Sequence, residues 1–591
     1  MVTIEFGKAE HQTLDNNSMF IKFYGSDFRT NVNKIKGYWN RIYIKETYEW
    51  EVPFSCFKEI QQLFSGSFVK YLNDPPKAKF VSDSDIIEGM DFNGYSLYDY
   101  QLEGVKYGLN HHNFLLLDEQ GLGKTLQLIT LARYRKLHHG LKHCLIICGV
   151  NSLKFNWQRE VDKFCKDEKA IVLGTKKNSR GRYVTLSKEE IIQQIDDCPD
   201  EFFWILNIER IRVTPDELRN KSGIVHHLNK QIENGELGMI AIDEIHKSKN
   251  INSAQSKGIM ALNPSAHKVG MTGTLLVNNP YDLYCPMTFV GLLSMSFKSF
   301  EYKYVLKNDW GQVIGFQNME ELHDILYKSS LRRTKDLLDL PPKIYAPECL
   351  NFTDDEWKVM DDITKYEYGG RYTDKIDPIM NSISMVTRMR QATVATELIN
   401  SSIIKSTKFS RLNDILEEAK SNNQKVLVFC PFTEALKLGL EYCKEFNPKL
   451  VCGGMGSKIQ EIIDEHEHTE GFSVIFAQEA TIGVGFTLTN TEICVFLSPP
   501  WNKATYDQCS DRIHRIGQKK TVKIIDLYIS DTYDEVIRSK LHGKGAMADI
   551  LIDGKDGEEL EAAMKYIDSM GIVFARRQSD VPQLTEPAKL F

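Results

Sequence analysis

The run LLLDEQGLGKTLQLITLARY, residues 115–134, carries the clearest structural signal in this chain of 591 residues. An apolar run, a glycine loop and a helix-forming run follow one another, so we expect a strand, a turn and a helix that begins near Lys124. Inward-turned N–H groups and the helix N-terminus favour anions, Lys124 can reach β- and γ-phosphates, and Thr125 can bind Mg²⁺. The strict phosphate-loop pattern has glycine where Asp118 stands, and a glycine turn with a surface lysine is the alternative. The predicted phosphate cradle comprises Gly121, Gly123, Lys124, Thr125 and Leu126.

Two adjacent carboxylates end a second apolar run, GMIAIDEIHKSKN, residues 238–250. Phosphoryl transfer needs one group that holds a metal and one that orients and deprotonates water, and Asp243 and Glu244 can divide these tasks. Taken alone, such a pair is more often an ordinary turn at a strand end. Because the pair follows a phosphate loop after two apparent strand–helix units, we favour the catalytic interpretation.

Two further polar runs are candidates for sensing and completing the same site. In VGMTGTLLVNNPYDLY, Thr272 and Thr274 follow a short strand and can relay the state of a γ-phosphate, although such hydroxyls usually cap a turn. In DRIHRIGQ, Arg512 and Arg515 are three residues apart and share one face of a helix. We expect both guanidinium groups to point at one phosphate, with solvated arginines on a surface helix as the alternative.

The chain alternates short apolar runs with amphipathic runs, which is the pattern of parallel sheets covered on both faces. The runs FLLLDE, CLIICG, FFWILN and GMIAIDE predict a first α/β domain, and KVLVFC, FSVIFA, EICVFL and VKIIDLYI a second of similar build. Pro341 and Pro342 break the chain between the two domains, and a polar, helical segment follows. The predicted limits are 1–90 for a small N-terminal module of a β-hairpin and a helix, 91–340 for the first α/β domain, 341–400 for a linker and helical bracing segment, 401–552 for the second α/β domain, and 553–591 for a C-terminal helix and loose tail.

Composition and charge narrow the class of protein. The chain is 42% hydrophobic and 26% charged, as in globular proteins, and its formal net charge of -7 does not by itself predict a nucleic-acid partner. The basic run GTKKNSRGRY is one local cluster that can meet phosphates, with a solvated face as the equal alternative. The twelve cysteines form no C-x-x-C pair, which favours free thiols, a reducing compartment and no structural metal. With neither a signal-peptide pattern nor an apolar run long enough to cross a bilayer, we expect a soluble intracellular protein with no membrane partner.

The order of these motifs resembles the Swi/Snf-type (sucrose non-fermenting) ATPases of helicase superfamily two, from about Tyr95 to Lys544. SLYDYQLEGV is similar to the glutamine motif of that family, which implies that Gln101 reads adenine. DEQGLGKT, NSLKFNWQREVDKF, DEIH and MTGTLLVNN resemble the motifs of its first lobe, and VLVFCPFTEAL, EATIGVGFTLTNTEICVFLSPPWN and YDQCSDRIHRIGQ those of its second. The resemblance implies an α/β fold of two tandem RecA-like lobes that close on one ATP with Mg²⁺. The small N-terminal α+β module and a helical insertion between the lobes would be additions to this core.

The resemblance also implies roles for single residues. Arg512 and Arg515 are implied to be arginine fingers that reach across the cleft, a device that contributes on the order of 10³ to 10⁵ in rate. The implied coupling residues are Thr272, Thr274, His246 and Gly485. The implied DNA contacts, mostly to sugar and phosphate, are Lys154, Lys247, Asn250, Thr433 and Trp501.

We therefore expect an ATP-dependent DNA translocase that acts on duplex or forked DNA in replication, repair or recombination, by fork remodelling or strand annealing. The N-terminal run YWNRIYIKETYEWEVPFSCFKEIQQL is similar to the small module of HepA-related annealing helicases, although core packing explains Trp39, Tyr43, Trp50 and Phe54 equally well. A strand-separating DNA helicase and an ATP-switched clamp that binds DNA structures without turnover are the alternatives. We expect a monomer with replication or repair proteins as partners, in a bacterial cytoplasm or nucleoid, a virus-infected cell or, in a eukaryote, the nucleus.

Overall fold

The computed structural model describes residues 1–7, 18–36, 41–44, 47–53, 57–72, 82–149, 153–179, 183–197, 200–273, 280–308, 310, 313–365, 382–399, 406–455, 458–482, 486, 488–500, 503–535, 537–538 and 541. The chain divides into two compact units, which are unit 1, Met1–Leu337, and unit 2, Leu338–Phe591. The boundary between the units falls next to Pro341 and Pro342, close to the predicted limit at 340.

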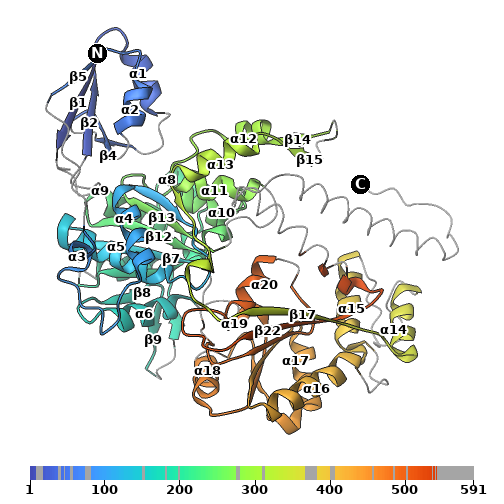
Figure 1. Cartoon of the computed structure of the whole chain (residues 1–591). Helices are drawn as coiled ribbons and strands as arrows, with labels where there is room; N and C mark the ends of the chain where they lie inside the picture. The colour runs from blue at the N-terminus through green and yellow to red at the C-terminus, as the bar shows by residue number, and fades with distance from the viewer. Residues whose placement is uncertain are drawn as a thin grey trace. The chain divides into compact units, whose positions relative to one another are not determined.

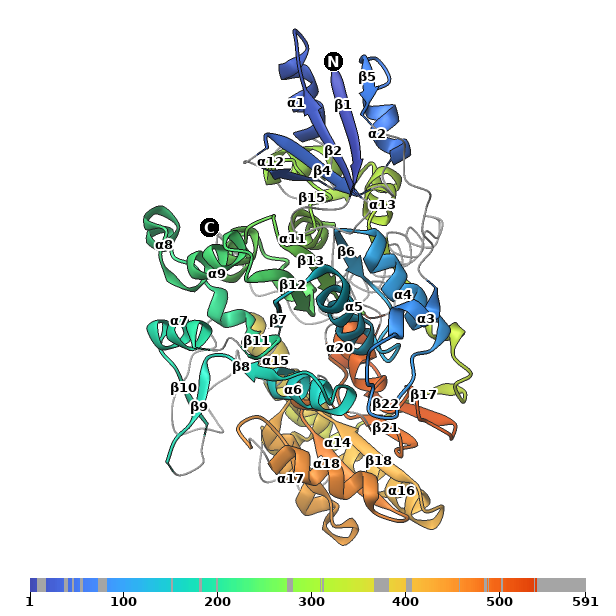
Figure 2. The same cartoon turned by 90° about the vertical axis from the view of Figure 1, so that its left-hand side faces the viewer.

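Unit 1 begins with a small α+β module. Its five strands lie in the order β3-β4-β2-β1-β5, with β1 antiparallel to β2 and parallel to β5. Figure 2 shows these strands beside helices α1 and α2. Ile4, Ile21, Val52 and Phe64 are fully buried in the module. Its elements are β1 (Val2–Gly7), β2 (Ser18–Phe23), α1 (Phe28–Lys36), β3 (Ile42–Ile44), β4 (Glu49–Pro53), α2 (Phe57–Leu63) and β5 (Val69–Tyr71). The module is larger than the predicted hairpin and helix, because β1 and β2 lie outside the aromatic-rich run on which that prediction was based.

Seven parallel strands form the central sheet of unit 1, in the order β16-β6-β13-β12-β7-β11-β8. Every residue of β6, β7 and β11 is buried, as their continuous apolar runs predicted. Because β6, β13 and β12 are neighbours, the polar residues that follow these strands meet at one edge of the sheet. The strands are β6 (Asn113–Leu116), β7 (His143–Cys148), β8 (Ala170–Val172), β11 (Phe203–Asn207), β12 (Leu237–Asp243), β13 (His267–Met271) and β16 (Ser330–Leu331).

Helices and two short hairpins complete unit 1. The helices are α3 (Asp83–Ile87), α4 (Asp99–Asn110), α5 (Lys124–His139), α6 (Leu153–Phe164), α7 (Lys188–Asp196), α8 (Pro215–Asn220), α9 (Gly223–Glu233), α10 (Ala254–Met260), α11 (Tyr281–Phe289), α12 (Phe297–Tyr304) and α13 (Met319–Tyr327). The hairpins pair β9 (Thr175–Lys177) with β10 (Tyr183–Thr185), and β14 (Val305–Lys307) with β15 (Val313–Phe316). Strands β9 and β10 contain parts of the basic run GTKKNSRGRY, of which residues 180–182 lie outside the described residues.

Unit 2 is built on a parallel sheet of six strands in the order β17-β22-β21-β18-β20-β19. The strands are β17 (Lys343–Leu350), β18 (Lys425–Phe429), β19 (Lys449–Val451), β20 (Ser473–Ala477), β21 (Ile493–Phe496) and β22 (Val522–Ile529). The helices are α14 (Asp354–Lys365), α15 (Ser382–Val394), α16 (Thr407–Ser421), α17 (Thr433–Tyr442), α18 (Lys458–His468), α19 (Glu479–Ile482) and α20 (Lys503–Ser510). Each half of the chain thus contains the parallel α/β architecture that the sequence predicted (Figure 1).

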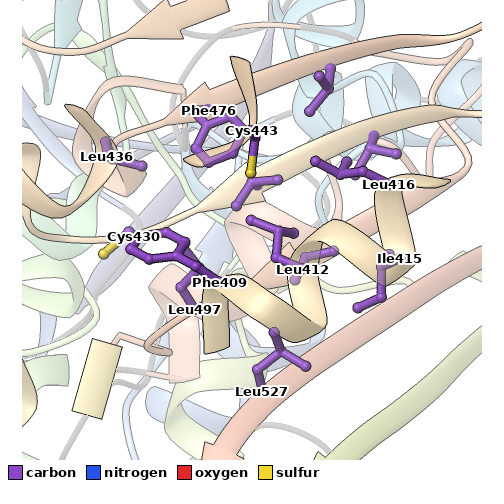
Figure 3. Close-up of a cluster of buried hydrophobic side chains, with 14 of the residues drawn as sticks. Phe409, Leu412, Ile415, Leu416, Cys430, Leu436, Cys443, Phe476, Leu497 and Leu527 are labelled. Atoms are coloured by element: carbon purple, nitrogen blue, oxygen red, sulfur yellow. The ribbon is translucent and has the colours of Figure 1, made fainter. Parts of the chain in front are cut away.

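Helices cover both faces of the sheet of unit 2. On one face α16 and α17 pack against β18 and β20, with Phe409, Leu412, Leu436 and Phe476 among the buried residues (Figure 3). On the other face α18 and α20 pack through residues such as Ile463 and Cys509. A sheet buried on both faces has strands that are apolar throughout, which is why its central strands are legible in the sequence.

The structure qualifies the predicted organisation at the start of the linker. The predicted linker 341–400 begins with an edge strand of unit 2, because β17 pairs with β22 along its whole length. The helices α14 and α15 follow, as the helical bracing segment predicted. The predicted tail 553–591 lies outside the described residues. Among the helices of the described part of the chain, none combines the length and the apolar character that crossing a membrane requires.

Candidate functional site

The phosphate loop joins the end of β6 to the start of α5. Gly123 has a left-handed φ of 73°, and a Cβ at this position would lie 2.2 Å from Gln101 Nε2, so the loop requires glycine here. The helix α5 begins directly afterwards, at Lys124 as predicted, and its first N–H groups form an anion-binding end. Lys124 Nζ donates to the carbonyl oxygens of Asp118 (2.7 Å) and Glu119 (3.1 Å). The ammonium group is thus held at the loop, where it can meet phosphate oxygens.

Gln101 ties α4 to this loop. Its Oε1 accepts a hydrogen bond from Tyr98 N–H at 3.0 Å, and its Nε2 donates to Leu122 O at 3.2 Å. The side chain is 2% exposed. Gln101 therefore has a structural role in shaping the loop, and its role in reading adenine stays a prediction.

Asp118, which departs from the strict phosphate-loop pattern, is fully buried and pairs with Arg333. The guanidinium donates from Nε to Asp118 Oδ1 at 3.0 Å and from Nη2 to Oδ2 at 2.5 Å. Gln127 closes the cluster, because its Oε1 accepts from Arg333 Nη2 at 2.8 Å and its Nε2 donates to Asp118 Oδ2 at 3.0 Å. A two-pronged arginine–carboxylate pair fixes geometry as well as charge. The aspartate that stands in place of glycine anchors the loop to Arg333.

Asp243 ends β12, and its carboxylate oxygen Oδ2 accepts a hydrogen bond from Trp157 Nε1 at 2.8 Å. Burial, reinforced by the neighbouring Glu244, raises the pKa of Asp243 to about 6. The Asp243 carboxylate and the Thr125 hydroxyl are hard oxygen ligands of the kind that Mg²⁺ prefers, so this donor set fits that ion. Within the described residues, no group of three or more His, Cys, Asp and Glu side chains is arranged to hold a metal by itself.

Glu244 lies at the centre of a hydrogen-bond network. Gln120 Nε2 donates to Glu244 Oε1 at 3.3 Å, and Thr272 Oγ1 donates to Oε2 at 3.2 Å. His246 Nδ1 lies 2.9 Å from Thr272 Oγ1 and 3.2 Å from Glu244 Oε2. Glu244 is 8% exposed and has a left-handed φ of 54°, a strained conformation that in proteins gathers at functional sites. The structure thus brings together Glu244, His246 and Thr272 from the ends of two neighbouring strands.

Arg512 and Arg515 follow α20 in unit 2 and converge on one oxygen. Each donates from Nη1 to Phe486 O, at 3.1 Å and 3.2 Å respectively. Arg512 is 5% exposed and also donates from Nε to Gln508 O, whereas Arg515 is only partly buried. The predicted helix does not extend to these residues, because α20 ends at Ser510 and turns follow it. Both guanidinium groups nevertheless point at one backbone oxygen, Arg515 is the more accessible of the two, and their contact with a phosphate stays a prediction.

The predicted DNA contacts differ in accessibility. Lys247 and Asn250 are exposed, and Thr433 is partly buried at the start of α17. Lys154 is 8% exposed, and burial lowers the pKa of its ammonium group, so contact with a phosphate requires this side chain to turn outward. Three predicted residues lie outside the described residues, namely Thr274, Gly485 and Trp501.

Two residues of the site were missed by the sequence analysis. Trp157 lies in a run that marked only a family motif, and nothing local shows that its indole N–H reaches Asp243. Arg333 lies in LRRTKDLLDL, which marked only the end of the first domain. The two consecutive arginines of this run, Arg332 and Arg333, precede the predicted domain limit, and this pattern could have suggested a role in the site for Arg333.

Comparison with known proteins adds the family. The chain matches the family model of the SNF2-related domain over residues 79–426 and the helicase conserved C-terminal domain over residues 407–517. An uncharacterized ATP-dependent helicase of Mycoplasma pneumoniae is 27% identical over 84% of this chain and 46% of that protein. The human SWI/SNF-related matrix-associated actin-dependent regulator of chromatin subfamily A member 1 is 26% identical over 83% of this chain and 47% of that protein.

The chain spans about half the length of the curated relatives it matches. Among solved structures, the Sulfolobus solfataricus SWI2/SNF2 ATPase core in complex with dsDNA is 24% identical, with a TM-score of 0.35 over 82% of this chain and 98% of that chain. The SNF2-related match covers more than half of the sequence and contains the phosphate loop, Asp243, Glu244 and Thr272. The chain therefore belongs to the SNF2-related family.

Proposed function

We propose that this protein is an ATP-dependent translocase of the Swi/Snf type that moves along duplex or forked DNA. One observation carries the proposal, namely that Lys124, Asp243, Glu244 and Thr272 gather at the carboxyl edge of one parallel sheet. Hydrogen bonds join this group across the edge, from Gln120 of the phosphate loop and from Thr272 to the Glu244 carboxylate. An anion-binding loop beside a metal-binding carboxylate and a base is the arrangement that phosphoryl transfer to water requires.

In this proposal ATP binds along the phosphate loop, where Lys124 Nζ exchanges its carbonyl partners for β- and γ-phosphate oxygens. Thr125 and Asp243 would hold Mg²⁺, whose charge offsets that of the transferring phosphoryl group. Glu244 orients a water molecule and takes its proton, while its two hydrogen-bond donors keep the carboxylate in place. The Thr272 hydroxyl contacts both Glu244 and His246. Loss of the γ-phosphate next to Glu244 would therefore be transmitted through Thr272 to the residues that follow β12 and β13.

Arg515, assisted by Arg512, would complete the site when ATP draws the two units together. Both arginines donate to Phe486 O, a neutral acceptor that a phosphate group readily displaces because hydrogen bonds between charged groups are stronger. Hydrolysis then depends on closure of the two units. Alternating closure and opening supplies the cycle of grip and release that moves the protein along DNA.

DNA would contact exposed polar residues of unit 1, beginning with Lys247 and Asn250. In the N-terminal module Trp50 is 9% exposed and packs against Tyr43, with ring centroids 4.7 Å apart. Core packing thus accounts for Trp50, whereas Tyr43 is 45% exposed and offers a ring on which an unpaired base can stack. This ring supports an action at forked DNA, as in fork remodelling or strand annealing.

A strand-separating helicase is the second candidate because of one feature of unit 1. The hairpin of β14 and β15 carries Trp310, which is 85% exposed, and Ile314, which is 66% exposed. An exposed aromatic ring on a hairpin can stack on the last base pair of a duplex and split it. In a fork-unwinding assay this candidate predicts that Trp310→Ala loses unwinding and keeps ATPase activity.

Displacement of a third strand from a triplex tests the proposal. The wild-type protein is expected to displace the strand with ATP and to fail with a non-hydrolysable analogue, and Glu244→Gln is expected to bind ATP and fail as well. Unwinding of a fork without triplex displacement would favour the helicase. Tight ATP-dependent DNA binding without turnover would favour the clamp, and either result would refute the translocase.

A further inference from the structure

The segment that joins the two units, residues 332–343, is bonded at its first end to the phosphate loop. Arg333 pairs with the buried Asp118 through Nε and Nη2, at 3.0 and 2.5 Å. The next loop residue is held too, because Glu119 N donates to Arg333 O at 3.0 Å and Lys335 N donates to Glu119 Oε2 at 2.8 Å. The first end of this segment is therefore tied to two consecutive residues of the loop.

The second end of the segment is bonded to the loop that carries the arginine pair in unit 2. His514 Nε2 donates to Pro341 O at 2.8 Å. Lys343 Nζ donates to Ser510 Oγ and Asp511 Oδ1, both at 2.9 Å. The side chains of Lys343 and Asp511 are each 14% exposed. Burial by itself lowers the pKa of Lys343, but the charge and hydrogen bonds around it, chiefly those of Asp511, together outweigh this effect, so the net change raises the pKa.

The chemistry of these contacts points to a mechanical role. An ion pair withdrawn from water adds little net stability compared with apolar packing. Stability alone therefore does not explain why one segment has such a pair at each end, the first with the buried Asp118 and the second with the partly buried Asp511. At the second end, Pro341 and Pro342 have fixed φ angles, which limits bending where the segment meets unit 2. Asp511 directly precedes Arg512, so a shift of Lys343 acts on the backbone of the arginine pair.

We propose that residues 332–343 are a strut that couples the phosphate loop to the arginine pair, with Arg333 and Lys343 as its positioning residues. ATP binding moves Asp118 and Glu119, the strut carries this displacement through the paired prolines, and the arginine pair is released from Phe486 O toward the phosphate. The strut rests on the ATPase function proposed above and adds to it the residues that time the arginine step.

Kinetics of Arg333→Met, Lys343→Met and the double variant form the first test. A small misplacement of catalytic groups lowers kcat by about 10- to 100-fold, and we expect this loss in each single variant, with the KM for ATP changed by less than about threefold. If the two residues belong to one device, the double variant has a kcat within about threefold of the slower single variant. Lys343→Arg, which keeps the charge, is expected to restore most of the rate.

Two other buried cations serve as matched controls. In unit 1, Arg133 is 1% exposed and pairs with Asp167 at 2.7 Å. In unit 2, Lys425 is 5% exposed, begins β18 and donates to backbone carbonyls. Arg133→Met and Lys425→Met are expected to lower the melting temperature while kcat of the folded protein stays within about twofold of wild type.

Hydrogen exchange with a non-hydrolysable ATP analogue forms the second test, which needs no turnover. In the wild type the analogue is expected to slow exchange in residues 118–125 and to change it in residues 511–518. Arg333→Met is expected to keep the first effect and lose the second, and so is Arg333→Lys, which retains charge without the two-pronged geometry.

The outcomes separate the strut from the proposed function. The strut would be overturned, and the ATPase left in place, if the losses of kcat in the double variant were additive. The same conclusion would follow if the wild type hydrolysed ATP and the variants behaved like the controls. A wild-type protein that neither binds the analogue nor hydrolyses ATP would overturn both.

Discussion

Replacing Trp157 with phenylalanine removes one hydrogen bond from the carboxylate proposed to hold Mg²⁺. The indole is 2% exposed, and its N–H donates to Asp243 Oδ2 at 2.8 Å. A hydrogen bond to a charged group contributes about 1.5–3 kcal/mol, or roughly 10- to 150-fold in an equilibrium constant. Groups that orient a metal ligand typically account for about 10- to 100-fold in metal affinity. We therefore expect the Mg²⁺ concentration for half-maximal ATPase activity to rise about 10- to 100-fold, with little change in kcat at saturating Mg²⁺.

The assay is a Mg²⁺ titration of the steady-state ATPase rate at saturating ATP and DNA. Trp204→Phe is the matched control, because Trp204 is also 2% exposed and, within the described part of the chain, its indole N–H has no hydrogen-bond partner. The control is expected to titrate like the wild type. An unchanged titration of Trp157→Phe would refute the reasoning, because Asp243 would then not hold the ion that hydrolysis needs.

Three further predictions concern catalysis, coupling and stability. Lys124→Ala and Arg515→Ala are each expected to abolish DNA-stimulated ATPase activity, with a loss of rate on the order of 10³-fold for the arginine variant. Fluorescence anisotropy is expected to show that both variants largely keep their affinity for DNA. Normal turnover in either variant would disprove the role assigned to that residue. Thr272→Val removes a hydrogen bond to Glu244 and is expected to lower kcat about tenfold with an unchanged KM for ATP, and a changed KM alone would contradict a role in the transition state. Burial lowers the pKa of His466 to about 3, so this histidine is neutral in the folded protein. Its contribution to the stability of unit 2 is present above pH 6.5 and is lost as the pH falls from 6.5 toward 3, by up to about 1.4 kcal/mol per pH unit. Urea unfolding at pH 7 and pH 5 is expected to show a smaller loss of stability on acidification for His466→Gln than for the wild type, and equal losses would contradict it.

The central strands of both sheets could be predicted because their burial leaves a continuous mark in the sequence. β7 and β18 are buried at every residue, and after His143 and Lys425 at their first positions they consist of apolar residues and cysteine. The phosphate loop, Asp243 and Glu244 were predictable for a related reason. Residues that follow parallel strands meet at one edge of the sheet, so their chemistry can be combined without knowing the coordinates.

The edge strand β17 could not be predicted, because one of its faces is open. Its residues alternate between partly buried and exposed, and the run KIYAPECL contains a proline, so it reads as a linker. A strand of this kind is defined by its partner β22 rather than by its own composition.

The partners of the proposed catalytic residues were equally hidden. Trp157 and Asp243 are separated by 86 positions, and Arg333 and Asp118 by 215, so only the fold brings them together. The burial of Lys154 has the same origin, since its local sequence is that of a polar helix start. Sequence patterns thus point to the groups that are proposed to do the chemistry, and tertiary structure identifies the groups that hold them in position.

The decisive experiment on the proposed translocase is the steady-state ATPase rate, measured with no DNA, single-stranded DNA, blunt duplex and forked duplex, each over a range of salt concentrations. We expect a low basal rate, strong stimulation by duplex or forked DNA, and a loss of that stimulation as salt weakens contacts with phosphates. Stimulation by single strands alone, or no turnover with any DNA, would contradict this expectation.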